Sequence, residues 1–289
     1  MFKKILFFVF LIFVFLSNSV LAKDIELVHF SDVHLDSQSS DKKVRKFAQT
    51  IPMFERAIEK VNKINPSLVL FSGDMINKPL ESEFDLFLNK ANNLVAPYYV
   101  VFGNHDVGVL GGVSKSILLD KINMYSDVKI ETSSYFIIKD DYIFIFMDGT
   151  TDKIITANGF FSKESLSFLD NTLKNNKDKK AVIIQHFPLM TPFRSFTHEI
   201  LNKDEYFSVL DKYSNVIMVL AGHYHSPKVI VRNNVAHITT SSMVEYPHAF
   251  RYIKVRDNKE NIILETKLLA DEWQNPNYRN FKEVIKLQK

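Results

Sequence analysis

The chain of 289 residues contains no cysteine. It therefore forms no disulfide bond and carries no lipidated cysteine, so its folded state depends on a hydrophobic core. Any metal site must use histidine, carboxylate, amide and water ligands, because thiolates are absent. A hydrophobic content of 46% with 24% charged residues is that of an ordinary globular protein and excludes an intrinsically disordered chain.

The chain also lacks a strong charge imbalance. Its formal net charge is +3, and two of the positive charges, Lys3 and Lys4, lie in an N-terminal segment that we expect to be removed. A mature chain near neutrality has no overall field to attract nucleic acid or a membrane surface. No lysine- or arginine-rich stripe supports extended contact with a phosphate backbone, so specific nucleic-acid binding is not expected.

A long apolar run occurs only at the N-terminus. Lys3 and Lys4 precede the apolar segment from Ile5 to Leu16, which is followed by polar residues and by Val20-Leu21-Ala22. This order is typical of a secretory signal peptide, so residues 1–22 are predicted to direct export to the periplasm or the extracellular space. The alternative is an uncleaved anchor, but the run is short for a membrane span of about 20 residues. No membrane span is expected after cleavage.

Beyond Lys23, strand and helix patterns alternate and then give way to hairpins. Strand patterns at 25–30 and 68–71 flank a helical pattern at 44–64, whereas 228–240 indicates a hairpin that turns at Asn233-Asn234. Early βα units followed by hairpins predict an α/β fold. We expect a layered α-β-β-α sandwich with mixed central sheets and a metal site at the carboxyl ends of the strands.

The chain shows neither an internal repeat nor a linker that would divide it. Residues 23–270 are therefore predicted to form one domain. Residues 271–289 are mostly polar, with Trp273 and Phe281 as their aromatic side chains of interest, and they are predicted to be either a docked helix or a tail.

Five apolar runs end on residues that can bind metal ions. Carboxyl ends of parallel strands meet at one edge of an open α/β sheet, so these residues are expected to converge. Seven donors are too many for one tetrahedral ion and suit two ions that share a carboxylate. Two such ions can generate a hydroxide nucleophile and polarise phosphoryl oxygens. The seven residues are Asp32, His34, Asp74, Asn104, His186, His223 and His225.

These residues stand in motifs that resemble those of the calcineurin-like metallophosphoesterase superfamily. The motifs are Asp32-x-His34, Gly73-Asp74, Gly103-Asn104-His105-Asp106, His186 and Gly222-His223-x-His225. The resemblance implies that residues 23–270 form a metallophosphoesterase domain. It implies two divalent metal ions (Mn, Fe or Zn), a small phosphate-ester substrate and attack by a metal-bridging hydroxide.

The resemblance also implies a role for each residue. Asp74 would bridge the two ions. His105 would be the catalytic imidazole that protonates the leaving oxygen, and Asp106 would accept the other N–H of His105 and fix its tautomer. The first ion would be held by Asp32, His34 and His225, and the second by Asn104, His186 and His223.

The motifs differ from those of one branch of this superfamily. Its protein phosphatases carry an Asp-Arg pair soon after the Gly-Asp motif and a glutamate at the end of the Asn-His string, whereas this chain has Met75-Ile76-Asn77-Lys78 and Asp106. The pattern is more similar to bacterial phosphodiesterases of the cyclic-nucleotide type, so small phosphodiesters or nucleotides are the expected substrates. The alternatives are a broad phosphomonoesterase or nucleotidase that scavenges phosphate, and a non-catalytic protein that binds metal or phosphate esters. The sequence predicts no oligomeric state.

Some residues outside these motifs have two interpretations. The segment 187–205 is interpreted as a long functional loop, in which His198 either contacts substrate or is simply exposed. His248 lies in a loop that either reaches the site or does not. Asp148 either supports the site or serves the turn that Asp-Gly indicates. The candidates for a substrate wall are Phe193, Arg194 and Phe196.

Overall fold

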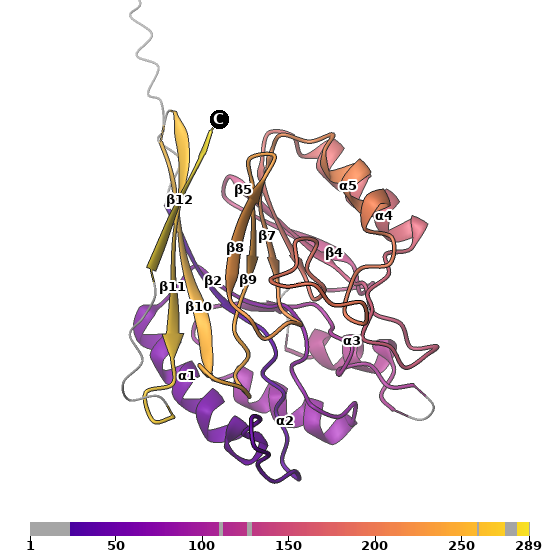
Figure 1. Ribbon diagram of the computed structural model, residues 1–289, viewed down its shortest axis with the longest axis vertical. Helices are drawn as coiled ribbons and strands as arrows, with labels where there is room; N and C mark the ends of the chain where they lie inside the picture. Colours follow the sequence, from indigo (N-terminus) through magenta and orange to yellow (C-terminus); the bar gives the residue numbers. More distant parts are fainter. Residues whose placement is uncertain (1–23, 110–111, 126–128, 259, 275–281, 289) are drawn as a thin grey trace, which may run out of the picture.

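Two six-stranded sheets lie face to face, and helices cover the outer side of each (Figure 1). The predicted layered α-β-β-α sandwich with mixed sheets is confirmed. The predicted signal peptide lies outside the described residues. The computed structural model describes residues 24–109, 112–125, 129–258, 260–274 and 282–288.

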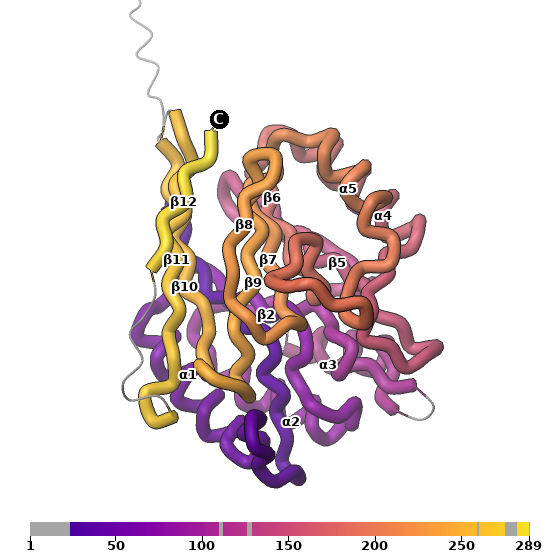
Figure 2. Tube along the Cα trace, viewed as in Figure 1, coloured from indigo at the N-terminus to yellow at the C-terminus, as the bar shows by residue number. Residues whose placement is uncertain are grey.

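The first sheet combines the early strands with the late ones, in the order β12-β11-β10-β1-β2-β3. β1, β2 and β3 are parallel, whereas β10 to β12 are joined antiparallel. β1 pairs with β10, so the first strand of the described chain lies beside a strand from its last part, while β12 forms the edge of the sheet (Figure 2). The strands are β1 (Ile25–Phe30), β2 (Leu68–Phe71), β3 (Tyr98–Val100), β10 (Ala249–Asp257), β11 (Asn261–Ala270) and β12 (Lys282–Gln288).

The second sheet has the order β4-β5-β6-β7-β9-β8. Its central strands β5, β6, β7 and β9 are parallel, and the hairpins place β4 and β8 antiparallel at its edges. The predicted turn at Asn233-Asn234 is confirmed, and both residues have positive φ. The strands are β4 (Tyr135–Lys139), β5 (Tyr142–Met147), β6 (Lys180–Gln185), β7 (Val216–Ala221), β8 (Lys228–Arg232) and β9 (Val235–Thr239).

Five α-helices among the described residues cover the sheets. α1 (Thr50–Ile64), α2 (Glu81–Ala91) and α3 (Lys115–Asn123) pack on the first sheet, and α4 (Lys163–Asn175) and α5 (Lys203–Leu210) pack on the second. The helical pattern at 44–64 thus produces a helix that begins later than predicted, after a short 3-10 turn, Phe47–Gln49.

The space between the sheets is filled by apolar side chains from both of them. Leu27 and Leu70 of the first sheet meet Phe144, Ile184 and Leu220 of the second, and all five are fully buried. Burial of each such side chain contributes about 1.5–3 kcal/mol to stability. This core fixes the two sheets relative to each other, and with them the strand ends that carry the predicted ligands.

Two expectations about the chain were wrong. Residues 282–288 form the edge strand β12 instead of a docked helix or a tail. Ile285 and Leu287 alternate with polar residues and pack between the sheets, which is the period of a strand. The segment 187–205 is not entirely a loop either, because α5 begins at Lys203.

Candidate metal centre

The carboxyl ends of β1, β2, β6 and β7 lead into loops that meet at one edge of the sandwich. Within each sheet the loops are joined by backbone hydrogen bonds, from Asp32 N to Gly73 O (3.0 Å) and from Gly222 N to His186 O (3.0 Å). The sheets are joined where the His223 N–H donates to Asp32 Oδ2 at 2.9 Å. The predicted convergence of the strand ends is therefore present.

Asp32, His34 and His225 form the first cluster of donor atoms. His34 Nε2 lies 3.1 Å from His225 Nε2, and His225 Nε2 lies 3.3 Å from Asp32 Oδ1. His34 Nε2 is also 3.9 Å from that oxygen. Two imidazole nitrogens and a carboxylate oxygen thus face one another closely enough to bind a common cation.

Asp74, His186 and His223 form the second cluster. His186 Nε2 lies 3.3 Å from Asp74 Oδ2 and 3.2 Å from His223 Nδ1. The same Asp74 oxygen lies 3.6 Å from His34 Nε2 of the first cluster. Asp74 therefore reaches both clusters, which is the position predicted for a bridging carboxylate.

Asn104 provides a test of whether the site fits metal ions. Its side-chain oxygen is buried and finds no hydrogen-bond partner among the described residues. A buried carbonyl oxygen left without a partner costs about 1–3 kcal/mol, and coordination of a cation would remove that cost. Histidine nitrogens with carboxylate and amide oxygens form the mixed donor set that Mn, Fe and Zn accept. The residues present fit two divalent cations.

The pKa values of the clustered Asp and His side chains are shifted by burial and by their charged neighbours. Burial opposes ionisation of Asp32 and Asp74, yet the neighbouring imidazoles hold the pKa of each carboxyl below its usual range. Burial likewise opposes protonation of His186, but Asp74 raises its pKa to about 9. For His223, burial dominates and lowers the pKa to about 3. The two carboxylates are thus charged, and they provide the negative potential that attracts cations.

The backbone at the strand ends is unusual. Five of the seven predicted ligands have positive φ angles, between 46° and 69°, although none of them is glycine. This left-handed region is uncommon for residues with a side chain, and such strain concentrates at functional sites. The five are Asp32, His34, Asp74, His223 and His225.

Glycines beside the ligands allow the loops to approach closely. Gly73 has a φ of 92°, and a Cβ at this position would lie 2.6 Å from Gly103 N. A Cβ at Gly222 would overlap the side chains of Ser31 and Asp32. The glycines of the sequence motifs therefore permit a separation that no other residue allows.

His105 lies beside the clusters, but its partner is not the one predicted. Its Nδ1 donates to the main-chain oxygen of Asn77 at 2.8 Å. The Asp106 carboxylate instead accepts the N–H groups of Gly103 at 2.8 Å and of Ile76 at 3.1 Å. The predicted Asp106–His105 hydrogen bond was therefore wrong, because the Asp106 side chain turns back to the main chain. Asp106 holds the loop, and a carbonyl group fixes the tautomer of His105.

Asp106 is also completely buried. Burial, together with the negative charge of Asp74, raises its pKa to about 8, while its two N–H donors act in the opposite direction. Its burial and its two bonds to main-chain N–H groups give it a structural role in the loop between β3 and α3.

Two residues of the site were missed by the sequence analysis. Glu245 Oε1 lies 3.0 Å from His225 Nδ1, and Arg45 Nε donates to the same oxygen at 2.7 Å. Glu245 follows β9, which is parallel to β7 and ends at the same edge. The sequence signal that could have revealed Glu245 is its place shortly after the apolar strand β9.

The segment 187–205 contributes to a hollow of about 210 Å³ beside the second cluster. His198 and Phe193 both line it, and the ring centre of His198 lies 5.0 Å from that of His223. Arg194 stacks on Phe196, with its guanidinium carbon 5.0 Å from the ring centre. His198 and Phe193 are therefore placed to contact a bound molecule.

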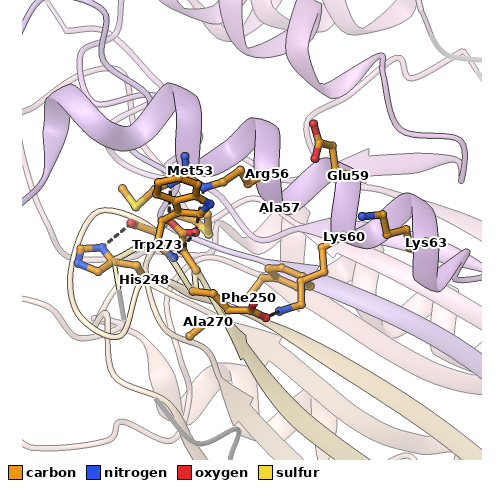
Figure 3. A pocket seen from close by; sticks show the side chains of 13 residues that line it. Met53, Arg56, Ala57, Glu59, Lys60, Lys63, His248, Phe250, Ala270 and Trp273 are labelled. Atoms are coloured by element: carbon orange, nitrogen blue, oxygen red, sulfur yellow. Dashed lines mark hydrogen bonds and ion pairs between the residues drawn. The ribbon is translucent and has the colours of Figure 1, made fainter. Parts of the chain in front are cut away.

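His248 and Asp148 do not join the clusters. Figure 3 shows His248 at a separate hollow of about 390 Å³ between α1 and the segment after β11, beside Arg56 and Trp273. Its Nδ1 donates to Met243 O at 2.9 Å. Asp148 accepts from Lys115 Nζ at 2.6 Å and from Thr150 N at 2.8 Å. The turn interpretation of Asp148 is the one that the structure supports.

The sequence pattern of the calcineurin-like phosphoesterase family matches residues 25–227. The chain belongs to this family. Its motifs and its paired Asp and His clusters are thus those of a metal-dependent phosphoric ester hydrolase, and divalent metals are implied by the fold.

Curated relatives share about a quarter of the sequence. A "Probable cyclic nucleotide phosphodiesterase" of Moraxella catarrhalis is 24% identical over 69% of this chain and 70% of its own length. A "3',5'-cyclic-nucleotide phosphodiesterase" of Nostoc sp. is 24% identical over 75% of this chain and 78% of its own. A "Probable glycerophosphodiester phosphodiesterase" of Arcobacter nitrofigilis is 25% identical over 62% and 64%.

Solved structures show that the fold is shared more widely. A dimetal phosphatase from Danio rerio superposes with a TM-score of 0.70 at 16% identity, and the match covers 91% of this chain and 98% of that one. A purple acid phosphatase from yellow lupin gives a TM-score of 0.60 at 15% identity, over 90% and 54%.

Proposed function

We propose that this protein is an exported phosphodiesterase that hydrolyses small phosphodiesters with two divalent cations. One observation carries the proposal: Asp74 of the second donor cluster also faces His34 of the first, and the buried oxygen of Asn104, which follows Gly103 in the loop against Asp74, has no other partner among the described residues. Two divalent cations bound at this site would attract the negative charge of a phosphate ester.

The side chains of the strand ends would hold the cations. Asp32, His34 and His225 would bind one, and Asn104, His186 and His223 the other, with Asp74 between them. When bound, the two cations would activate water and withdraw negative charge from the phosphoryl oxygens. The buried loops keep the donor atoms in place before substrate arrives, which lowers the cost of reorganisation.

His105 would supply the proton for the leaving oxygen. Because its Nδ1 donates to a carbonyl group, only Nε2 is available to the substrate. Its ring lies edge-on to His34, with centres 4.6 Å apart, and the main-chain N–H of His105 donates to Asp74 Oδ1 at 2.8 Å. The loop that carries the proton donor is thus bonded to the carboxylate that faces both clusters.

The names of the relatives support a diester over a monoester. The proteins of Moraxella, Nostoc and Arcobacter are all named as phosphodiesterases. The chain also lacks the arginine that follows the Gly-Asp motif in protein phosphatases, since Met75-Ile76-Asn77-Lys78 stands there.

The test begins with metal-free protein reloaded separately with Mn, Fe and Zn. We expect two ions per chain and faster hydrolysis of bis-p-nitrophenyl phosphate than of p-nitrophenyl phosphate. The Asn104→Ala variant serves as the internal control, since it should lose metal and turnover together. Preference for the monoester would identify a scavenging phosphatase instead. Two bound ions without turnover of either ester would contradict catalysis.

Export is the second part of the proposal, and it is supported by the sequence of residues 1–22. Among the described residues, no helix is long and apolar enough to cross a membrane. Expression of the full chain, followed by cell fractionation and mass determination of the product, should give an exported protein that begins at Lys23. A cytoplasmic product that retains residues 1–22 would contradict export.

A further inference from the structure

Two hollows flank the metal centre, and they differ in charge. The smaller one contains the charged side chains of Arg45 and Glu245. The larger one, of about 420 Å³, borders Asn104 and His105. Among the described residues that line this larger hollow, none is lysine, arginine, aspartate or glutamate. We call it the apolar hollow.

Most of the wall of the apolar hollow comes from the loops after β3 and β5, and Pro79 adds to it from the loop after β2. Val107 and Val109 follow His105, and Ile154 and Ile155 belong to the second loop. Ile154 is 63% exposed and Ile155 88% exposed. Large aliphatic side chains held open to solvent beside a catalytic centre are typical of a surface that binds an apolar group.

We infer that the apolar hollow binds the leaving alcohol of the substrate, and that this alcohol is uncharged and largely apolar. The inference rests on the proposed function. His105 lines the hollow and gives its proton to the leaving oxygen, so the alcohol extends from the phosphorus toward this side. A second phosphate or a carboxylate on that alcohol would lie against aliphatic side chains and would meet no cationic side chain among the described residues that line the hollow.

The reaction then has a defined direction through the site. A P–O bond forms to the oxygen of water, and the P–O bond to the alcohol breaks with its electron pair on the alcohol oxygen. His105 gives that oxygen a proton, and a proton from the attacking water returns to His105 after turnover. The retained phosphate group stays at the metal centre, beside the smaller hollow with Arg45.

Binding of phosphonates to the full, metal-loaded chain tests the inference without turnover. We expect butylphosphonate to bind at least about tenfold more tightly than methylphosphonate, because three further methylenes enter an apolar surface. 3-Phosphonopropionate, which ends in a carboxylate, should bind no more tightly than methylphosphonate. Isothermal titration calorimetry measures all three affinities.

Variants of the lining residues test whether the preference for butylphosphonate arises in the apolar hollow. The double variant Val109→Ser with Ile154→Ser should reduce the preference for butylphosphonate to about two- or threefold. Ile138→Ser alters an isoleucine that is 51% exposed on β4, and it should leave the preference intact. Thr156→Lys places a cation in the lining and should strengthen binding of 3-phosphonopropionate about tenfold over wild type.

The outcomes separate this inference from the proposed function. Equal binding of methylphosphonate and butylphosphonate, with diester turnover intact, would overturn the inference alone. No gain for 3-phosphonopropionate in Thr156→Lys would also overturn it, provided that this variant still binds methylphosphonate. If no phosphonate binds the metal-loaded chain and no ester is turned over, both proposals fail.

Discussion

Glu245 Oε1 lies 3.0 Å from His225 Nδ1, while Nε2 of the same ring faces Asp32. The hydrogen bond from His225 lowers the pKa of Glu245 to about 2. Burial opposes protonation of His225, but Asp32 and Glu245 raise its pKa to about 9. A carboxylate that accepts the N–H of an imidazole orients the ring and increases the basicity of its other nitrogen. Glu245 is therefore placed to position His225 as a metal ligand.

Glu245→Gln should lower the affinity of the first metal site about 10–100-fold, because the amide keeps the size of the side chain but loses its charge. Glu245→Ala should lower it further, since the ring also loses its orientation. Titration of metal-free protein against a competing chelator measures both. Glu131→Gln removes the charge of a glutamate that is 76% exposed, and it should change nothing. Unaltered affinity in both Glu245 variants would contradict this role.

Asn104→Ala should reduce the metal content from two ions per chain to one. Its amide oxygen has no partner other than the expected cation among the described residues, so the change removes a ligand and spares the hydrogen bonds of the fold. Elemental analysis after dialysis measures the content, and thermal unfolding without metal tests the fold. Asn93→Ala, which alters an exposed helix-end amide, should keep both ions. Two tightly held ions in Asn104→Ala would exclude Asn104 as a ligand.

His105→Ala should slow the hydrolysis of a diester most when its leaving oxygen needs a proton to depart. Loss of a general acid typically costs about 10²–10⁴-fold, but a p-nitrophenolate leaving group departs as a stable anion. We therefore expect a large loss of kcat with an alkyl leaving group and a much smaller loss with p-nitrophenolate. Metal content should stay at the wild-type level. Equal losses with both leaving groups would show that His105 binds the phosphate without donating a proton.

The strands, and the candidate ligands at their ends, could be proposed from the sequence because each depends on local pattern. An apolar run such as Leu68–Phe71 predicts a buried strand, and the polar residues that follow must emerge at its end. Asp74 follows β2 of the first sheet and His186 follows β6 of the second, so the packing of the two sheets brings together residues that lie far apart in the chain. The positive φ angles of ligand candidates such as Asp74 could not be predicted from the sequence, because they are imposed by tertiary contacts.

The errors came from contacts that depend on the folded chain. His105 is oriented by the main-chain oxygen of Asn77. Every residue has a main-chain oxygen, so the sequence does not show which one will accept this hydrogen bond. Glu245 reaches His225 only because β7 and β9 are neighbours in the sheet. The strand β12 has only Ile285 and Leu287 facing inward, which is too few apolar residues to be distinguished from a polar tail.

His237 should make the protein less stable in acid. It lies on β9 between Val219 and Ile230 of the adjacent strands, is 4% exposed, and neither ring nitrogen has a partner among the described residues. Burial and the nearby Arg232 lower its pKa to about 4, whereas Asp211 acts weakly in the opposite direction. Between an unfolded pKa of about 6.5 and a folded pKa of about 4, only the unfolded chain binds the proton.

The contribution of a neutral His237 is therefore complete above about pH 6.5 and is lost as the pH falls toward 4, by an amount of about 3 kcal/mol. Urea unfolding of metal-free wild type and His237→Phe, at several pH values, measures the difference directly. The variant should gain stability relative to wild type as the pH falls from 6.5, because phenylalanine takes up no proton. His237→Leu should reproduce the same pH dependence if the ring itself is not needed. A constant difference between wild type and both variants over this range would show that His237 does not titrate in the fold.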